Sequence, residues 1–150
     1  MSFETLHQVM CDIGPALDLA EVMAFPEHRL WTLAFDDGEL IEAETDETGR
    51  RVLFSMEAGE LSADNADASR TTMLEFNLLW GRTGGLHFAL ADRTAVLMLE
   101  LPAAEIDVPT LSTVLPNLRA HALQWRPLLA SLARPAPAET SPLAGGAIRV

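Results

Sequence analysis

The sequence predicts an α+β domain in which helices pack on one twisted antiparallel sheet. Three observations carry this prediction. Apolar residues recur at helical spacing near both ends of the chain, and an apolar helical segment lies in the middle. Strand-like segments flank that middle helix, and short turns containing Asp or Gly join them, which is typical of antiparallel neighbours. The expected order is α-β-β-β-α-β-β-α.

The first helix is expected to begin after Ser2, whose hydroxyl can cap the free backbone N–H groups. Its apolar stripe follows spacings of three and four residues. Gly14-Pro15 interrupts it, because proline has no N–H to donate to the preceding turn. We expect a kink or a short second turn there. The stripe consists of Phe3, Leu6, Met10, Ile13 and Leu17.

Three strands follow, over Leu30–Phe35, Leu40–Thr45 and Arg51–Glu57. Asp36-Asp37-Gly38 is a hairpin signal, because glycine adopts positive φ without strain. Apolar and polar residues alternate along the second and third strands. The pattern indicates a meander with one solvated face, followed by a loop over 59–69.

The second helix is expected over Arg70–Arg82, ended by Thr83-Gly84-Gly85. It is apolar nearly all round, and such a helix is normally buried on more than one side. One face would pack on the sheet and another on a second subunit, which predicts a homodimer.

Two further strands are expected over Leu86–Ala91 and Ala95–Leu101. The second contains an uninterrupted apolar run, Val96 to Leu99, which predicts that both of its faces are covered. Pro102 would end this strand.

The last helix is expected to be capped by Asp107 and to continue to about 132. Pro116 and Pro127 should kink or split it. The predicted domain covers 1–133, and the Pro- and Gly-containing segment 134–150 is expected to be a flexible tail.

Composition excludes several classes of function. The chain has 150 residues and a net charge of −12, so a phosphate backbone is an unfavourable partner. All ten basic residues are Arg, which excludes chemistry that needs a lysine amine. The acidic stretch 36–67 is interpreted chiefly as a solvated face, with discrimination among partners as the alternative. No secretory signal or membrane-spanning run is seen, so we expect a cytoplasmic protein that inserts in no membrane.

Candidate catalytic and metal-binding groups are few. The lone Cys11 lies four residues after His7, so their side chains can meet on one helix face. A small buried thiol beside a surface histidine is the favoured interpretation. The four histidines lack zinc-ligand spacing. We therefore predict no catalytic site, no metal and no cofactor.

The predicted elements contain more large apolar side chains than one small sheet can cover. These side chains lie in the first and second helices, the first hairpin and the last strand. Surplus apolar surface marks protein–protein contact, and a well-filled core is the alternative. Four strings in matching places then resemble class I chaperones of bacterial type III secretion, the Tir-chaperone-like family, over about 3–132. These are Leu33-Ala-Phe-Asp-Asp-Gly38, Leu74-Glu-Phe-Asn-Leu-Leu-Trp80 with Thr83-Gly84-Gly85, Leu101-Pro102, and Trp125-Arg126.

The resemblance implies a non-catalytic chaperone in protein transport and virulence. It would hold the N-terminal segment of a secreted effector in extended form, soluble and competent for secretion, with a strand added at the sheet edge. Phe76, Gly14-Pro15 and Pro116 depart from the family pattern. The implied effector-binding residues are Phe3, Leu6, Met10, Trp31, Leu33, Phe35 and Phe54, some of which must be core because side chains alternate along strands. The implied dimer interface is Leu74, Leu78, Trp80, Leu97 and Leu99.

Two other hypotheses stay open. The first is a dimeric α+β adaptor that binds a folded regulatory partner. The second is an enzyme with an unrecognised carboxylate or Cys/His site, which would need a pocket holding a titratable group with a shifted pKa. A bound partner that is disordered when free would favour the chaperone over the adaptor.

Overall fold

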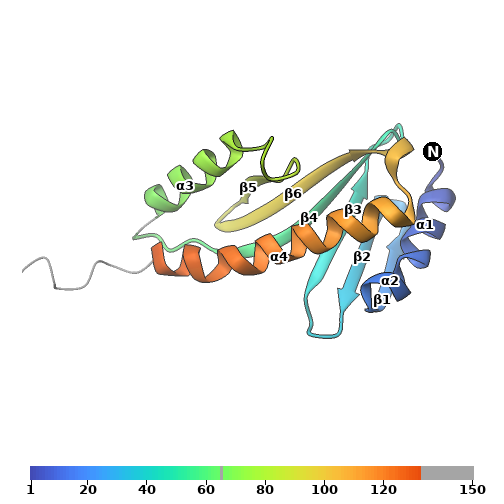
Figure 1. The fold of residues 1–150 in the computed structure, drawn as a ribbon, viewed down its shortest axis with the longest axis horizontal. Helices are drawn as coiled ribbons and strands as arrows, with labels where there is room; N and C mark the ends of the chain where they lie inside the picture. The colour runs from blue at the N-terminus through green and yellow to red at the C-terminus, as the bar shows by residue number, and fades with distance from the viewer. Residues whose placement is uncertain (65, 133–150) are drawn as a thin grey trace, which may run out of the picture.

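A computed structural model describes residues 1–64 and 66–132. The proposed tail, 134–150, lies outside the described residues. All strands join one antiparallel sheet in the order β1-β2-β3-β4-β6-β5 (Figure 1). The helices are α1 (Phe3–Asp12), α2 (Gly14–Leu17), α3 (Ala66–Leu78) and α4 (Val108–Leu132). The strands are β1 (Leu19–Phe25), β2 (Leu30–Phe35), β3 (Leu40–Thr45), β4 (Arg51–Glu60), β5 (His87–Ala91) and β6 (Thr94–Pro102).

The predicted fold class is confirmed, and the structure adds one strand to the predicted order. The added strand, β1, forms a hairpin with β2 across the 3-10 turn Pro26–His28. Its residues are exposed or half-buried, because β1 lies at the edge of the sheet. Without a fully buried side it shows no strict alternation, and its apolar run from Val22 to Phe25 is too short to distinguish a strand from a helix segment, so no strand was predicted here.

The N-terminal helix ends as Gly14-Pro15 predicts. The Ser2 hydroxyl accepts a hydrogen bond from the Thr5 backbone N–H at 3.1 Å, so the expected cap is present. The helix α1 stops at Asp12, and α2 forms one short turn with Pro15 near its start. Asp18 then takes a left-handed conformation, with φ of 52°, and directs the chain into β1.

Two helix predictions need correction. The helix α4 is a single element that contains both Pro116 and Pro127, so the prolines do not split it. Buried side chains along α4, among them Leu115 and Leu118, pack on the sheet and offset the two missing backbone bonds. The helix α3 runs over Ala66–Leu78, earlier than predicted at both ends, and turns follow it to Gly85.

The core lies between one face of the sheet and the helices. Alternate residues of β3 and β4 point into it, as the burial pattern of each strand shows. In Figure 1, α4 crosses this face of β2, β3 and β4, and α1 lies beside the β1–β2 end. The fully buried side chains include Leu6, Met10, Trp31, Leu33, Ile41, Phe54, Leu97, Leu111 and Leu115.

The other sheet face has no helix over it among the described residues. This face corrects the prediction for the apolar run in β6. Leu97 and Leu99 point to the core and are buried, whereas Val96 and Met98 point outward and stay half-buried. Within one protomer, β6 is therefore covered on one face only.

Candidate protein-binding site

The open sheet face, defined here as the outward side chains of the sheet, mixes apolar and acidic groups. Residues directly opposite each other in antiparallel strands share a face. The paired residues therefore define rows that cross the sheet. One row is Met23, Thr32, Glu42, Ser55, Met98 and His87. The next is Phe25, Leu30, Glu44, Leu53 and Glu100.

The outer edge of β1 borders this face. Among the described residues, no strand pairs with that edge. Exposed edges are usually protected by charge or proline, and β1 has a single ionisable residue, Glu21, and no proline. Phe25 at its end is 41% exposed. The edge is thus open to pairing with an extended chain.

Five of the seven implied effector-binding residues lie in the core. Leu6, Met10, Trp31, Leu33 and Phe54 have no exposed surface in the protomer. They gather where α1 meets the sheet. Helical spacing and strand alternation in the sequence show which residues share a face, but they do not show which face is covered. Effector contact at these positions stays a prediction.

Phe3 and Phe35 lie at the margin of the same cluster and keep part of their surface exposed. The ring of Phe3 stacks on Trp31, with centroids 4.3 Å apart. The Arg119 guanidinium lies 4.5 Å from the centre of the Phe35 ring, a cation–π contact. Of the seven residues, these two are placed to meet a partner without rearrangement.

The His7–Cys11 pair differs from its expected form. Trp31 donates its indole N–H to His7 Nδ1 at 3.3 Å, so the histidine satisfies the one polar atom of a buried tryptophan. Cys11 is exposed rather than buried, with Sγ 3.6 Å from His7 Nε2. The contacts give this histidine a structural role.

The residues implied for the dimer interface fall into two groups. Leu74, Leu78 and Trp80 are 69%, 80% and 68% exposed, whereas Leu97 and Leu99 lie in β6 and are buried in the core. With Leu79, which is 47% exposed, the first three form what we call the α3 patch. A single protomer does not test the interface, which stays a prediction.

The helix bearing this patch is attached to β5 by Asn77. Its amide donates to the Phe88 carbonyl at 3.0 Å and accepts from the Phe88 N–H at 2.6 Å. Phe76, which departs from the family pattern, packs edge-on against Phe88 and Trp125, at centroid distances of 5.0 and 5.4 Å. The inward side of α3 is therefore fixed, which leaves its apolar outer side uncovered.

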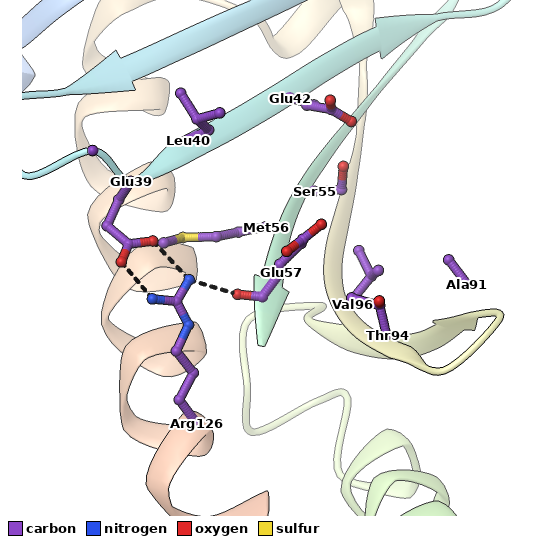
Figure 2. Close-up of a pocket in the computed structure, with 11 residues that line it drawn as sticks. Glu39, Leu40, Glu42, Ser55, Met56, Glu57, Ala91, Thr94, Val96 and Arg126 are labelled. Atoms are coloured by element: carbon purple, nitrogen blue, oxygen red, sulfur yellow. Dashed lines mark hydrogen bonds and ion pairs between the residues drawn. The ribbon is translucent and has the colours of Figure 1, made fainter. Parts of the chain in front are cut away.

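Two arginines of α4 hold the β2–β3 hairpin. Arg126 forms a bidentate pair with Glu39, and Arg119 pairs with Asp37. The hydrogen bonds from Arg126 hold the pKa of Glu39 below its ordinary value, and the same pair raises the pKa of Arg126. This pair lines a cavity of about 380 Å³ between the hairpin, β4 and the β5–β6 turn (Figure 2).

Metal and membrane sites receive no support from the described part of the chain. Within residues 1–64 and 66–132, no group of three or more His, Cys, Asp or Glu residues could hold a metal ion. No helix in these ranges is long and apolar enough to cross a membrane.

A protein-family model decides the family. The model of the Tir chaperone protein (CesT) family matches residues 11–126. The chain belongs to the CesT family. This family is one of chaperones and not of enzymes, and the resemblance drawn from the sequence is confirmed. No curated protein matches this CesT-family chain at a significant level.

Solved structures share the fold of this CesT-family chain. A structure of the ExsC–ExsE complex matches with a TM-score of 0.69 and 20% identity, covering 84% of this chain and 94% of that chain. The HopA1–SchA chaperone–effector complex matches with a TM-score of 0.65 and 18% identity, covering 84% of this chain and 98% of that chain. A third match is the Yersinia pestis type III secretion chaperone SycH in complex with a stable fragment of YscM2. Its TM-score is 0.63 at 19% identity, and the match covers 83% of this chain and 99% of that chain.

Proposed function

We propose that this CesT-family chain is a chaperone of type III secretion. It binds the N-terminal segment of a secreted effector in extended form and keeps that segment soluble and competent for export. It acts in the bacterial cytoplasm without catalytic activity. The family match over residues 11–126 is the observation that carries the proposal.

The similar structures support a protein partner. HopA1–SchA is a chaperone–effector complex, and SycH is a type III secretion chaperone bound to a fragment of YscM2. The match covers 98% and 99% of the chains in those two structures, so the fold found there is present here almost in full, which supports a partner of the same kind.

The open edge of β1 offers an extended effector segment a place to bind. Adding a strand there satisfies backbone N–H and C=O groups whatever the effector sequence, and this supplies affinity. Side chains of the same segment then meet Phe25, the open sheet face or the exposed surface of Phe3, and these contacts supply selectivity. Ordering a flexible segment costs entropy, so the bound segment must be long.

The α3 patch supports a homodimer. Four large apolar side chains, three of them more than two-thirds exposed, are an unusual surface for a monomer. Pairing of two α3 patches across a twofold axis would remove this surface from water. Leu74, Leu78 and Trp80 would touch the second copy, and Leu97 and Leu99 would support them from the sheet. Two copies also double the surface available to one effector segment.

The decisive experiment is capture from the native cytoplasm. The full chain, carrying an affinity tag, is used to isolate a partner, which is then digested by limited proteolysis while bound and identified by mass spectrometry. We expect one protected, extended segment near the N-terminus of a larger secreted protein. The same segment should be cleaved rapidly when the partner is alone.

Two results would contradict this proposal. A partner that is folded and protease-resistant without the chain would indicate the adaptor function instead. Capture that persists unchanged when Val22 in β1 is replaced by Pro would show that the β1 edge does not pair with the partner, since proline removes a strand donor. The melting curve of Val22→Pro must first show that the sheet remains folded.

A further inference from the structure

The sheet opens into a fork between β3 and β4. Pairing between these strands stops at Glu42 opposite Ser55. Both strands continue, however, because β3 stays paired with β2 as far as Leu40, and β4 stays paired with β6 as far as Glu60. The register of the pair, extended further, would put Leu40 opposite Glu57. Instead the strands diverge there, and the cavity of about 380 Å³ lies between them.

Arg126 closes the inner end of the fork. Its guanidinium reaches from α4 and pairs with both carboxylate oxygens of Glu39, the residue before β3. The same group donates from Nη2 to the Glu57 carbonyl of β4 at 3.0 Å (Figure 2). A guanidinium thus bridges the two strands where their own hydrogen bonds end. The fork already binds one group of this kind, through a carboxylate and a free strand carbonyl.

The outer part of the fork keeps an uncompensated negative charge. Glu42 faces Ser55 across the strands, and Glu57 lies two residues along β4 on the same face (Figure 2). Both are exposed, and no basic side chain of the described residues lies within 4.0 Å of either carboxylate. Because Arg126 already compensates Glu39, the lining carries two net negative charges.

Part of the fork lining is apolar. Leu40 is 46% exposed and stands at the β3 side. Val96 and Ala91, from the far side of β4, line the cavity as well. The site therefore combines apolar contact area with two carboxylates on one open sheet face.

We propose that this fork receives an extended, basic segment of the bound effector, an inference that rests on the proposed function. An apolar side chain of the segment packs on Leu40 and Val96, and a neighbouring Arg or Lys pairs with Glu42 and Glu57. An acidic segment would meet like charge and be rejected. Strand pairing at the β1 edge and the apolar contacts beside it do not distinguish charge, so the fork adds selection by charge.

Two synthetic peptides test the charge selection. One alternates Leu and Arg, and the other has Gln in place of each Arg, so that only the charge differs. Binding to the full chain is measured by titration calorimetry at physiological ionic strength, where distant surface charges are screened beyond roughly 8 Å. We expect the Arg peptide to bind more tightly.

Two matched variants locate the effect. Glu42→Gln with Glu57→Gln removes the two outer carboxylates of the fork and leaves Glu39 in place, and Glu47→Gln with Glu75→Gln removes two exposed carboxylates elsewhere. The fork variant should bind the Arg peptide with about tenfold lower affinity than the parent chain, whereas the control should change this affinity by less than about twofold. The Gln peptide should bind both variants like the parent chain.

The proposal is overturned if both double variants weaken the Arg peptide equally, because overall charge would then explain the preference. It is overturned as well if the two peptides bind alike, or if neither binds. None of these results touches effector binding itself, which the capture experiment tests separately. Failure of capture with a preserved Arg preference would instead contradict the proposed function.

Discussion

Two apolar regions of the described residues differ in what lies opposite them. Phe54 and Trp31, on the core face of the sheet, are fully buried by the protomer's own helices. Leu78 and Trp80, at the end of α3, are 80% and 68% exposed. Both regions consist of large apolar side chains, and they differ only in whether helices of the same protomer cover them. The first region is the core of the protomer, and the second is where a partner would bind.

The largest expected effect is in the core. Phe54→Ala should lower the free energy of unfolding by about 3–5 kcal/mol, because the lost ring leaves a cavity in a fully packed interior. Leu78→Ala, a matched truncation in the α3 patch, should change the stability of the isolated protomer by under about 1 kcal/mol. Urea denaturation at submicromolar concentration measures both. Similar losses for the two variants would erase the contrast between the regions.

The next effect concerns assembly rather than folding. Trp80→Asp should convert a dimer into a folded monomer, because an unpaired carboxylate is costly to bury in an interface. Light scattering at micromolar concentration should show the mass halved. Phe25→Asp, an equivalent change at the opposite edge of the sheet, should leave the mass unchanged. A Trp80→Asp protein that keeps the mass of its parent would place the dimer contact elsewhere.

A smaller effect is expected at the attachment of α3 to β5. Asn77→Ala should cost about 1–3 kcal/mol, since it leaves the Phe88 N–H and C=O without their amide partner in a partly buried position. Asn77→Asp keeps the acceptor but places a carboxylate oxygen against the Phe88 carbonyl oxygen, so its loss should be at least as large as that of Asn77→Ala. Thermal unfolding ranks the three proteins. Equal stability of Asn77→Ala and its parent would mean that the buried side chains of α3, such as Met73 and Phe76, hold the helix without the Asn77 hydrogen bonds.

The sequence was sufficient for the fold class because that information is local. Periodicity located α1 and α4, and Gly38 and Gly84-Gly85 marked turns that the structure contains with positive φ. It missed β1, which lies at an edge and has no fully buried side. It also left open a split at Pro116 or Pro127, where packing of α4 on the sheet keeps the helix continuous.

The candidate sites were less accessible to such reasoning. Alternation grouped Trp31, Leu33 and Phe54 correctly but did not show that helices cover their side of the sheet. The fork is a break in pairing between β3 and β4, and no single residue marks it. Arg126 and Glu39 are 87 residues apart in sequence, so only the folded chain brings them together.

The smallest expected effect on stability concerns the pair of Arg126 and Glu39, which is only partly exposed. Hydrogen bonds from Arg126 lower the pKa of Glu39, with Arg119 adding to this effect and Asp37 opposing it. A carboxyl whose pKa is depressed by folding stabilises the protein above its unfolded pKa, and this contribution is lost as pH falls through the folded value. Glu39→Gln should therefore cost about 1–2 kcal/mol at pH 7, the range for a charge-assisted hydrogen bond.

The difference between parent and Glu39→Gln should hold constant from pH 7 to about pH 5 and shrink below about pH 4, near and beneath the ordinary carboxyl pKa. Urea denaturation across this pH range measures it, with Glu47→Gln as an exposed control that should show no such trend. A difference that is independent of pH would mean that Glu39 stabilises the hairpin through packing. The ion pair between Arg126 and Glu39 would then add nothing to stability. The fork's inner carboxylate, Glu39, would no longer differ in this respect from its outer carboxylates, Glu42 and Glu57.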